Sequence, residues 1–444
     1  MAVPNPRPAL SRRGFLGAAG AAGIATAGLL TGCNRAASGG AGGGSTPLKF
    51  WNMPWGNTQF NVLDKQITTG FKPPSGKTHM EYQIIQWATW QQTFTSAVDS
   101  NTGPAISSGG GTQAFQFEAA GKIAYADDLI DSWKKNGLYD DFPTGLLDTM
   151  KTKNGYAAVP YNLDMRVLWY NPTLLQKAGA DLPTDWNSFE KACAALKKIG
   201  VYGWGTGAAA GADGSQGIVA WMINNGGGLF GPDQQPDMVT QANIDAIEYI
   251  LMLVKNGYVD PHSPTYTSAN ITAQWKAEKF GMGIDTAGLA AGIGGTVGNT
   301  IRVGDPLTSM SGKKGSLYFP NNIMMYTNTP SQKDSEAFMT YYYQHMKKLW
   351  TSNTGIGLPP LKSISNTPEF QANKNYVKVF NDWLPISKTW AAPGSTSLYK
   401  NITSVDGTQP INDFAQSILG GKTTAKAALQ KFQDATVKIL KGQS

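Results

Sequence analysis

The chain has 444 residues, a formal net charge of +7, 41% hydrophobic residues and only two cysteines. This length is sufficient for two lobes with separate apolar cores, and no run of lysine and arginine interleaves with aromatic residues, which argues against a nucleic-acid partner. Two cysteines are too few for a framework of several disulfides.

The first 32 residues have the layout of an export signal rather than of a folded segment. The pair Arg12-Arg13 directly precedes an uncharged stretch, residues 14–32, that is rich in glycine and alanine, which is typical of a twin-arginine signal peptide. A stretch of this length and composition inserts poorly into a bilayer, so a transmembrane anchor is the weaker interpretation. Removing residues 1–32, which carry three arginines and no acid, lowers the net charge from +7 to +4.

The export signal ends at Leu30-Thr31-Gly32-Cys33, which resembles the lipobox of bacterial lipoproteins. The resemblance implies that cleavage leaves Cys33 as a lipidated N-terminus, which holds the mature protein on the outer face of the cytoplasmic membrane. Residues 33–46, rich in glycine, alanine and serine, predict a flexible tether with a reach of roughly 20 Å. The other cysteine, Cys193, lies on the apolar face of an expected helix and is predicted to be an inert core residue.

From Leu48 onward, strand-like and helix-like stretches alternate, which predicts an α/β architecture. Strands are expected at residues 48–51, 80–84, 105–107 and 280–284. Two amphipathic helices are expected to end at Gly200 and Gly257, and a third to begin at Thr424. Their predicted buried faces carry Phe189, Ala192, Cys193 and Leu196, then Ile244, Ile247, Leu251 and Val254, then Ala428, Phe432, Ala435 and Ile439. The glycine-rich residues 292–298 lack dinucleotide-binding spacing and are expected to form a loop.

Three loops are candidates for a binding site. Ligands of open α/β sheets bind beyond the carboxyl ends of the strands, where loops meet helix N-termini. Residues 53–59, 109–113 and 285–288 follow expected strands and combine glycines with polar or aromatic side chains. The candidate ligand-binding residues in these loops are Trp55, Asn57, Gly111, Thr112, Gln113 and Asp285.

Thirteen tryptophans are the main compositional oddity of the chain. A flat apolar ring is a surface on which the C–H face of a sugar can pack, so this composition favours a carbohydrate ligand. The candidates for stacking are Trp55, Trp204, Trp221 and Trp390, whereas Trp51, Trp87 and Trp186 are expected to be packing residues.

Asp164 and Arg166 lie two residues apart in an expected extended segment, so both side chains can face a cleft. In that interpretation both residues bind the ligand. The alternative is an ion pair that braces the segment without contacting a ligand.

Six motifs of the mature chain occur in an order known from one protein family. They are residues 154–164 with their continuation Leu168-Trp169-Tyr170-Asn171, then Pro183-Thr184-Asp185-Trp186, Asn225-Gly226-Gly227, residues 256–261, residues 280–284 and Ile418-Leu419-Gly420-Gly421-Lys422. In this order they resemble the extracellular solute-binding proteins of sugar ABC transporters, of the maltose-binding type. Asn225 and Gly226 join the candidate ligand-binding residues on this basis.

The resemblance implies a two-lobed periplasmic-binding-protein fold of type II, the Venus-flytrap architecture, with hinge-crossing strands. One lobe would comprise residues 46–157 and 305–352, and the other residues 158–304 and 353–444. The resemblance also implies that Asp164 hydrogen-bonds the hydroxyl groups of a sugar. A mono- or oligosaccharide would bind between the lobes and be delivered to the permease subunits of an ABC importer, with the protein acting as a monomer.

The sequence departs from the family at positions that recognise the ligand. Gly103-Pro104-Ala105 stands where the family usually shows Ala-Pro-Asp, and Gly288 stands where maltose-type proteins carry a stacking tryptophan. Residues 207–213 are nearly featureless. The family's fold therefore carries over to this chain better than the identity of its ligand.

Catalytic motifs are not evident in the sequence. His79, His262 and His345 are scattered without metal-ligand spacing, and no phosphate-binding loop is present, so no catalytic residue, metal or cofactor is predicted. A glycosidase needs two carboxylates about 5 to 10 Å apart, which a sequence does not reveal. A secreted carbohydrate-active enzyme therefore remains an alternative, as does a binding protein for a non-sugar solute such as a glycerophosphodiester.

Overall fold

The computed structural model of the protein describes residues 45–442. The predicted export signal, most of the predicted tether and the acylation site predicted at Cys33 lie outside the described residues. Within residues 45–442, no helix has both the length and the apolar character that a membrane crossing requires.

Strands and helices alternate along the chain, as the sequence predicts. The strands are β1 (Thr46–Asn52), β2 (Thr78–Ile84), β3 (Ile106–Gly109), β4 (Ile123–Ala124), β5 (Lys151–Thr152), β6 (Gly155–Tyr156), β7 (Val159–Tyr170), β8 (Tyr202–Gly205), β9 (Phe280–Thr286), β10 (Arg302–Val303), β11 (Ser316–Tyr326) and β12 (Ser387–Lys388). The helices are α1 (Thr58–Gly70), α2 (Trp90–Asp99), α3 (Gln113–Ala119), α4 (Asp127–Asn136), α5 (Leu138–Asp141), α6 (Pro172–Ala178), α7 (Trp186–Lys198), α8 (Gly214–Asn224), α9 (Gln241–Lys255), α10 (Ser268–Lys276), α11 (Leu289–Ile293), α12 (Gly295–Thr300), α13 (Gln332–His345), α14 (Lys348–Thr351), α15 (Lys362–Ser365), α16 (Pro368–Ala372), α17 (Lys374–Lys378), α18 (Gln409–Leu419) and α19 (Ala425–Gly442).

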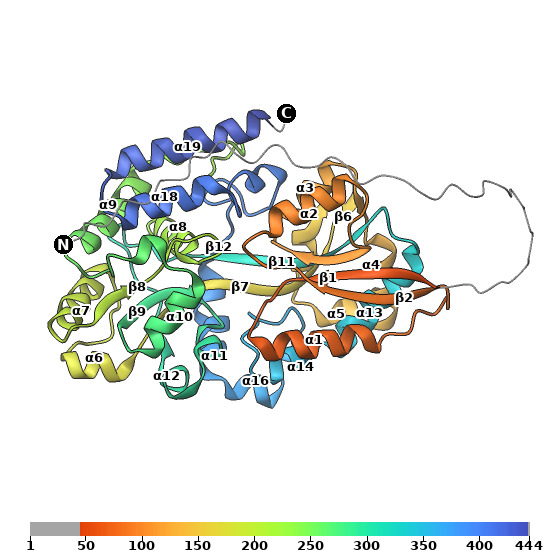
Figure 1. The fold of residues 1–444 in the computed structure, drawn as a ribbon, viewed down its shortest axis with the longest axis horizontal. Coiled ribbons are helices and arrows are strands. Elements are labelled where there is room, and N and C mark those ends of the chain that lie inside the picture. Colours follow the sequence, from red (N-terminus) through yellow and green to blue (C-terminus); the bar gives the residue numbers. More distant parts are fainter. Residues whose placement is uncertain (1–44, 443–444) are drawn as a thin grey trace, which may run out of the picture. The chain divides into compact units, whose positions relative to one another are not determined.

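The main sheet has ten strands, and its central path runs in the order β2-β1-β3-β11-β7-β9-β8 (Figure 1). At one end, β1 lies parallel to β2 and β3, with Phe50 opposite Tyr82 and Ile106. At the other end, β8 lies parallel to β9, with Tyr202 opposite Phe280. The four strands expected from the sequence are therefore confirmed as β1, β2, β3 and β9, with ends that differ by one or two residues.

The long strands β7 and β11 connect the two ends of the sheet. Residues 159–165 of β7 pair with β11, whereas residues 166–170 pair with β9. Similarly, β11 pairs with β7 through residues 318–323 and with β3 through residues 322–325. Figure 1 shows both strands between the β8 and β9 pair and the β1 and β2 pair. Both halves of the sheet therefore share these two strands.

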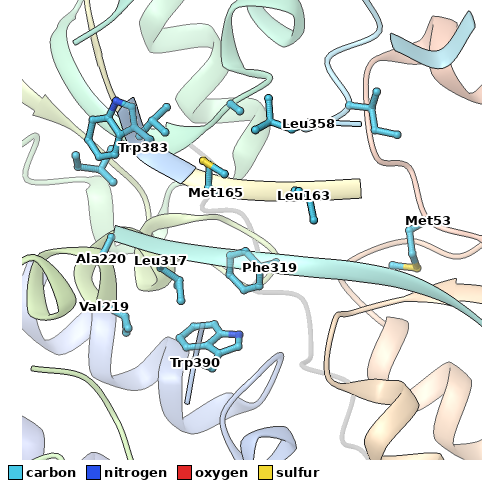
Figure 2. Packing of buried hydrophobic residues seen from close by; sticks show 14 of the residues in the cluster. Met53, Leu163, Met165, Val219, Ala220, Leu317, Phe319, Leu358, Trp383 and Trp390 are labelled. Atoms are coloured by element: carbon cyan, nitrogen blue, oxygen red, sulfur yellow. The ribbon is translucent and has the colours of Figure 1, made fainter. Parts of the chain in front are cut away.

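Large apolar side chains pack along the crossing strands (Figure 2). Leu163 and Met165 belong to β7, whereas Leu317 and Phe319 belong to β11, and all four are buried. The ring of Trp390 meets Phe319 edge to face, with the ring centroids 5.5 Å apart. This packing holds the strand pair rigid where the two halves of the sheet meet.

The helix predicted to end at Gly200 is α7, and its four predicted apolar residues are all buried. A capping box between Asp185 and Ser188 starts the helix, and Gly200 takes a φ of +76° after its end, a conformation that favours glycine. Cys193 is buried on this helix, and burial raises the pKa of its thiol well above the usual value. A Cβ atom on Gly203 would lie 2.4 Å from the Cys193 sulfur, so the thiol is closely packed.

The helices α9 and α19 form where the sequence predicts them, but their buried faces differ from the prediction. Ile244, Leu251 and Val254 of α9 are only half-buried, because the helix turns Asn243 inward, where its amide bonds the backbone of Gly228 and Met238. In α19 the predicted core residues Ala435 and Ile439 are half-buried, whereas Thr436 is buried and donates its hydroxyl to the Phe432 carbonyl. A hydropathy pattern does not reveal polar side chains that find backbone partners inside the core.

The glycine-rich residues 292–298 are not the loop that the sequence predicts. They belong to α11 and α12, which are separated by Gly294 with a φ of +65°. A Cβ atom on Gly298 would lie 2.4 Å from the carbonyl oxygen of Ala290. Close helix packing therefore uses the small residues here and outweighs their poor helix propensity.

Candidate functional site

A cavity of about 270 Å³ lies beside the crossing strands. This volume is near the lower end of the range for small-molecule sites, about 300 to 1,000 Å³. Most of its lining comes from the loops after β1, β2 and β3, from β7 and β11, and from residues 210–216 and 390–412. The cavity therefore collects side chains from both halves of the sheet.

Tryptophan rings form much of the cavity wall. The rings of Trp55 and Trp87 meet at 78° with centroids 4.8 Å apart, and Trp90 continues the row, 6.1 Å from Trp87. Trp390 lines the cavity together with Phe319. Trp55 and Trp87 are only half-buried, so their faces remain accessible to a ligand. The wall can therefore pack against the C–H face of a sugar ring.

Two tryptophans of the cavity wall, Trp87 and Trp90, are not among the site residues that the sequence predicts. Trp87 is expected from the sequence to be a packing residue, but it lines the cavity and donates its ring N–H to the Pro54 carbonyl at 3.3 Å. Trp90 also lines the cavity, although the sequence analysis assigns it no role. The spacing of two tryptophans three residues apart, directly after a predicted strand, is the signal that could have identified them.

Arg166 is the centre of the polar side of the cavity. It lies beside Asp164 on β7, and its guanidinium donates to Asp164 Oδ2 at 2.7 Å, to Asp213 Oδ1 at 3.0 Å and to the amide oxygen of Gln216. The guanidinium also lies over the Phe319 ring, 4.9 Å from its centroid. The predicted ion pair between Asp164 and Arg166 is therefore present, and both residues also line the cavity.

Burial and the charges of neighbouring groups together set the ionisation of this cluster. It opposes the charge on Arg166, but the carboxylates of Asp164 and Asp213 outweigh it and raise the pKa of Arg166 above its usual value. Burial raises the pKa of Asp213, although Arg166 works in the opposite direction. Burial and then the charge of Asp213 raise the pKa of Asp285 to about 7. Three carboxyl groups, those of Asp164, Asp213 and Asp285, therefore interact with the one guanidinium of Arg166.

Asp406 is a further carboxylate in the cavity wall that the sequence does not indicate. It is 7% exposed, and its Oδ2 accepts a hydrogen bond from the hydroxyl of Thr112 at 3.3 Å. Burial raises the pKa of Asp406 to about 6. Gly110 and Gly111 line the cavity next to it, and a Cβ atom on Gly110 would lie 2.6 Å from the Trp90 ring. Glycine is therefore required where the backbone approaches this wall.

Several predicted site residues lie away from the cavity lining. Trp204 and Trp221 pack in the core with their rings 6.1 Å apart, and Trp221 also meets Phe189 and Trp186. The other residues that do not line the cavity are Asn57, Thr112, Gln113, Asn225, Gly226 and Asp285. A ligand role for these residues therefore gains no support from the geometry.

Three of these residues have other partners. Asn57 caps α1 and donates its amide to the Asn353 carbonyl at 3.1 Å. Asn225 donates to the Ala242 carbonyl at 2.9 Å, and Asp285 accepts from the Thr286 N–H at 2.7 Å. Their polar side chains bond backbone groups rather than pointing into the cavity, and most side-chain hydrogen bonds in proteins are made to backbone or water.

Gly288 lies against the backbone of Gly355. A Cβ atom on Gly288 would lie 1.8 Å from the Gly355 carbonyl oxygen, so no side chain fits without moving that segment. The segment that follows Gly355 pairs with β7, because Leu358 and Leu163 exchange backbone hydrogen bonds. The space that a stacking tryptophan would need at position 288 is therefore occupied by backbone.

Comparison with known proteins identifies relatives. The sequence profile described as "Bacterial extracellular solute-binding protein" matches residues 76–348. A sugar transporter from Arthrobacter chlorophenolicus A6, solved with bound laminaribiose, is 45% identical, with a TM-score of 0.85 over 89% of this chain and 99% of that chain. No curated protein matches the sequence.

Two more distant structures are similar in fold alone. The GacH receptor of Streptomyces glaucescens GLA.O, solved without ligand and with acarbose, is 20% identical, with a TM-score of 0.74 over 89% of this chain and 99% of that chain. Maltose-bound MalE3 of T. maritima is 14% identical, with a TM-score of 0.74 over 89% of this chain and 100% of that chain. Together with the path of β7 and β11, these similarities confirm the predicted two-lobed α/β fold with crossing strands.

Proposed function

The chain belongs to the family of bacterial extracellular solute-binding proteins, and we propose that it is the substrate-binding protein of an ABC importer for a neutral sugar of disaccharide size. The cavity beside the crossing strands binds the sugar, and the protein delivers it to permease subunits in the membrane. The observation that carries this proposal is a single cavity that combines tryptophan rings with three carboxylates and one cation.

The two kinds of side chain match the two kinds of surface on a sugar. Trp55 and Trp87 offer apolar rings to the C–H face, and the carboxylates of Asp164, Asp213 and Asp406 accept hydrogen bonds from hydroxyl groups. The small cavity volume favours a short saccharide. Laminaribiose is the first candidate to test, since the transporter that is 45% identical binds it.

The charge balance of the cavity argues against a glycerophosphodiester. An anionic ligand would enter beside three carboxylates, and the one guanidinium already donates to Asp164, Asp213 and Gln216. Like charges at close range disfavour such a ligand strongly. An enzyme is the other alternative, and we propose instead that the sugar is released unchanged, in keeping with a family that acts in transport.

Ligand binding is proposed to favour a closed arrangement of the two lobes. A sugar that contacts walls from both halves of the sheet stabilises the closed form by its differential affinity. We place the change of lobe within β11 rather than at residue 305, because Leu307 and Gly315 accept hydrogen bonds from the amide of Asn224 on α8. The remaining predicted lobe boundaries stay as proposed from the sequence.

A ligand screen tests the proposed function. Laminaribiose is expected to raise the melting temperature and to bind with a micromolar dissociation constant, about −8 kcal/mol, whereas glycerophosphocholine is expected to have no effect. Trp55→Ala removes a stacking ring and is expected to weaken binding at least about tenfold. Calorimetry measures the affinity, and chromatography of the incubated sugar is expected to detect no products.

The matched control for the tryptophan variant is Trp51→Ala. Trp51 is also half-buried and packs on Phe94 with ring centroids 5.5 Å apart, but it does not line the cavity. This variant is expected to bind laminaribiose like the parent protein. Tighter binding of the phosphodiester than of any disaccharide, or cleavage of the sugar, would refute the proposal.

We also propose that a twin-arginine signal exports the protein and that Cys33 carries its lipid anchor. The sequence features that support this are Arg12-Arg13 and Leu30-Thr31-Gly32-Cys33. Cys33→Ser is expected to yield an exported protein that no longer sediments with membranes, since the acyl chains hold it there. Incorporation of labelled fatty acid into the variant at the parent level would rule out this anchor.

A further inference from the structure

We propose that Asp64, which lies outside the cavity, positions Trp55 through Asn52 and thereby sets the affinity for the ligand. The inference rests on the proposed function for its effect on sugar binding, but the placement of Trp55 can be measured without any ligand. Asp64 is a positioning residue in this proposal, because it does not line the cavity.

Asp64 is a fully buried carboxylate that accepts three hydrogen bonds. Its Oδ2 accepts from the Asn52 amide at 2.7 Å and from the Tyr82 hydroxyl at 2.6 Å, and its Oδ1 accepts from the Tyr342 hydroxyl at 2.5 Å. Burying a carboxylate in a core is unfavourable compared with an apolar residue of similar size. Its presence on α1 therefore suggests a function beyond packing.

The carboxylate fixes which way the Asn52 amide points. A carboxylate only accepts hydrogen bonds, so the Asn52 NH₂ group must face Asp64 and the Asn52 oxygen must face the opposite side. There, Asn52 Oδ1 accepts from the Trp55 ring N–H at 3.0 Å, from the Met53 backbone N–H at 2.9 Å and from the Ser108 hydroxyl. A reversed amide would direct its NH₂ group at these donors.

The Trp55 ring is thus held by its N–H group, and a ring contact with Tyr161 supports it as well. Its N–H also lies 3.0 Å from the Ser108 oxygen, and its ring meets Tyr161 edge to face at 6.2 Å. The Tyr161 hydroxyl lies 2.8 Å from that of Tyr342, which bonds Asp64. Asp64 therefore connects to Trp55 in two ways, through Asn52 and through Tyr342 and Tyr161.

A double-mutant cycle with laminaribiose tests the inference. Asp64→Ala is expected to weaken binding about tenfold, because the Asn52 amide loses the acceptor that orients it. In the Trp55→Ala background the same substitution is expected to change the dissociation constant less than about twofold, because its effect passes through Trp55. Equal losses in both backgrounds would overturn the proposal.

Two further variants separate positioning from general damage. Asp64→Asn keeps an oxygen that accepts from Asn52 and Tyr82. Its NH₂ group faces Tyr342, whose hydroxyl can donate to Tyr161 instead. The dissociation constant of this variant is therefore expected to lie within about threefold of the parent value. Tyr82→Phe removes a different hydrogen bond to the same Asp64 oxygen and is expected to leave affinity within about threefold. If Tyr82→Phe is as damaging as Asp64→Ala, the proposal fails.

The near-ultraviolet circular dichroism of the empty protein gives a readout that does not depend on the ligand. The difference between the parent protein and Trp55→Phe defines the Trp55 signal, which is expected to be lost in Asp64→Ala and kept in Asp64→Asn. If Asp64→Ala does not fold, Asn52→Ala replaces it in the cycle and in this measurement. A Trp55 signal that survives the replacement contradicts the inference, whereas a parent protein that binds no saccharide contradicts only the proposed function.

Discussion

Replacing Arg166 by methionine is expected to lower the free energy of unfolding by about 3 kcal/mol at neutral pH, because it leaves partly buried carboxylates without their buried cation. Arg166 is 3% exposed and donates to both Asp164 and Asp213. We take the lower end of the usual range for a broken buried pair, since the Asp213 side chain is 31% exposed and water relieves part of the penalty. Urea denaturation measures the loss.

The pH dependence of this loss has a definite sign. Burial already raises the pKa of Asp213 and Asp285 in the folded protein, the latter to about 7, and removing the guanidinium raises both further. A carboxyl group with a higher pKa in the folded state binds protons more readily when folded, so the folded state gains stability as the pH falls. The difference in the free energy of unfolding between the parent protein and Arg166→Met is therefore expected to be smaller at pH 5 than at pH 7.5.

Lys378→Met is the matched control for the arginine variant. The Lys378 ammonium also bridges two carboxylates, Asp305 and Asp382, but these side chains are 30% to 51% exposed. Surface pairs of this kind contribute about 0 to 1 kcal/mol, so little stability should be lost. An equal loss in both variants, or a loss in Arg166→Met that does not depend on pH, would argue against a buried ionic cluster.

Elements with a strong local pattern could be predicted from the sequence. The helix α7 follows from the spacing of Phe189, Cys193 and Leu196, a capping residue at its start and Gly200 after its end, all of which are local signals. The strands β1 and β9 follow from short apolar runs in the same way. Such elements are confirmed because each is specified by its own residues.

The cavity could be predicted only in part, because its walls meet through tertiary contacts. Trp55, in the loop after β1, and Trp204, within β8, are both stacking candidates in the sequence, yet one lines the cavity and the other packs in the core. Thr112 and Asp406 are hydrogen-bonded although 294 residues separate them. No local pattern marks Asp406 or the featureless segment before α8 that supplies Asp213.

Asp164 illustrates how two interpretations of one residue can be combined. The sequence leaves open whether Asp164 binds a ligand or braces Arg166. In the structure Asp164 forms an ion pair with Arg166, and its side chain also lies in the cavity wall with 17% of its surface exposed. If Asp164 is removed, Arg166 keeps Asp213 and Gln216 as partners. Bracing is therefore expected to be a minor part of its contribution, and hydrogen bonding to the ligand the larger part.

Asp164→Ala is expected to raise the dissociation constant for a disaccharide about ten- to hundredfold and to lower the melting temperature of the empty protein only slightly. Losing a charged acceptor that faces buried ligand hydroxyls corresponds to about 1.5 to 3 kcal/mol of binding free energy. Asp305→Ala, which removes an exposed carboxylate outside the cavity, should change neither quantity. Calorimetric affinity and the melting temperature of the empty protein, measured on the same preparations, distinguish the two roles. Unchanged affinity with a large loss of stability would assign Asp164 to bracing alone, because an ion pair that only holds Arg166 acts on the folded state rather than on the ligand.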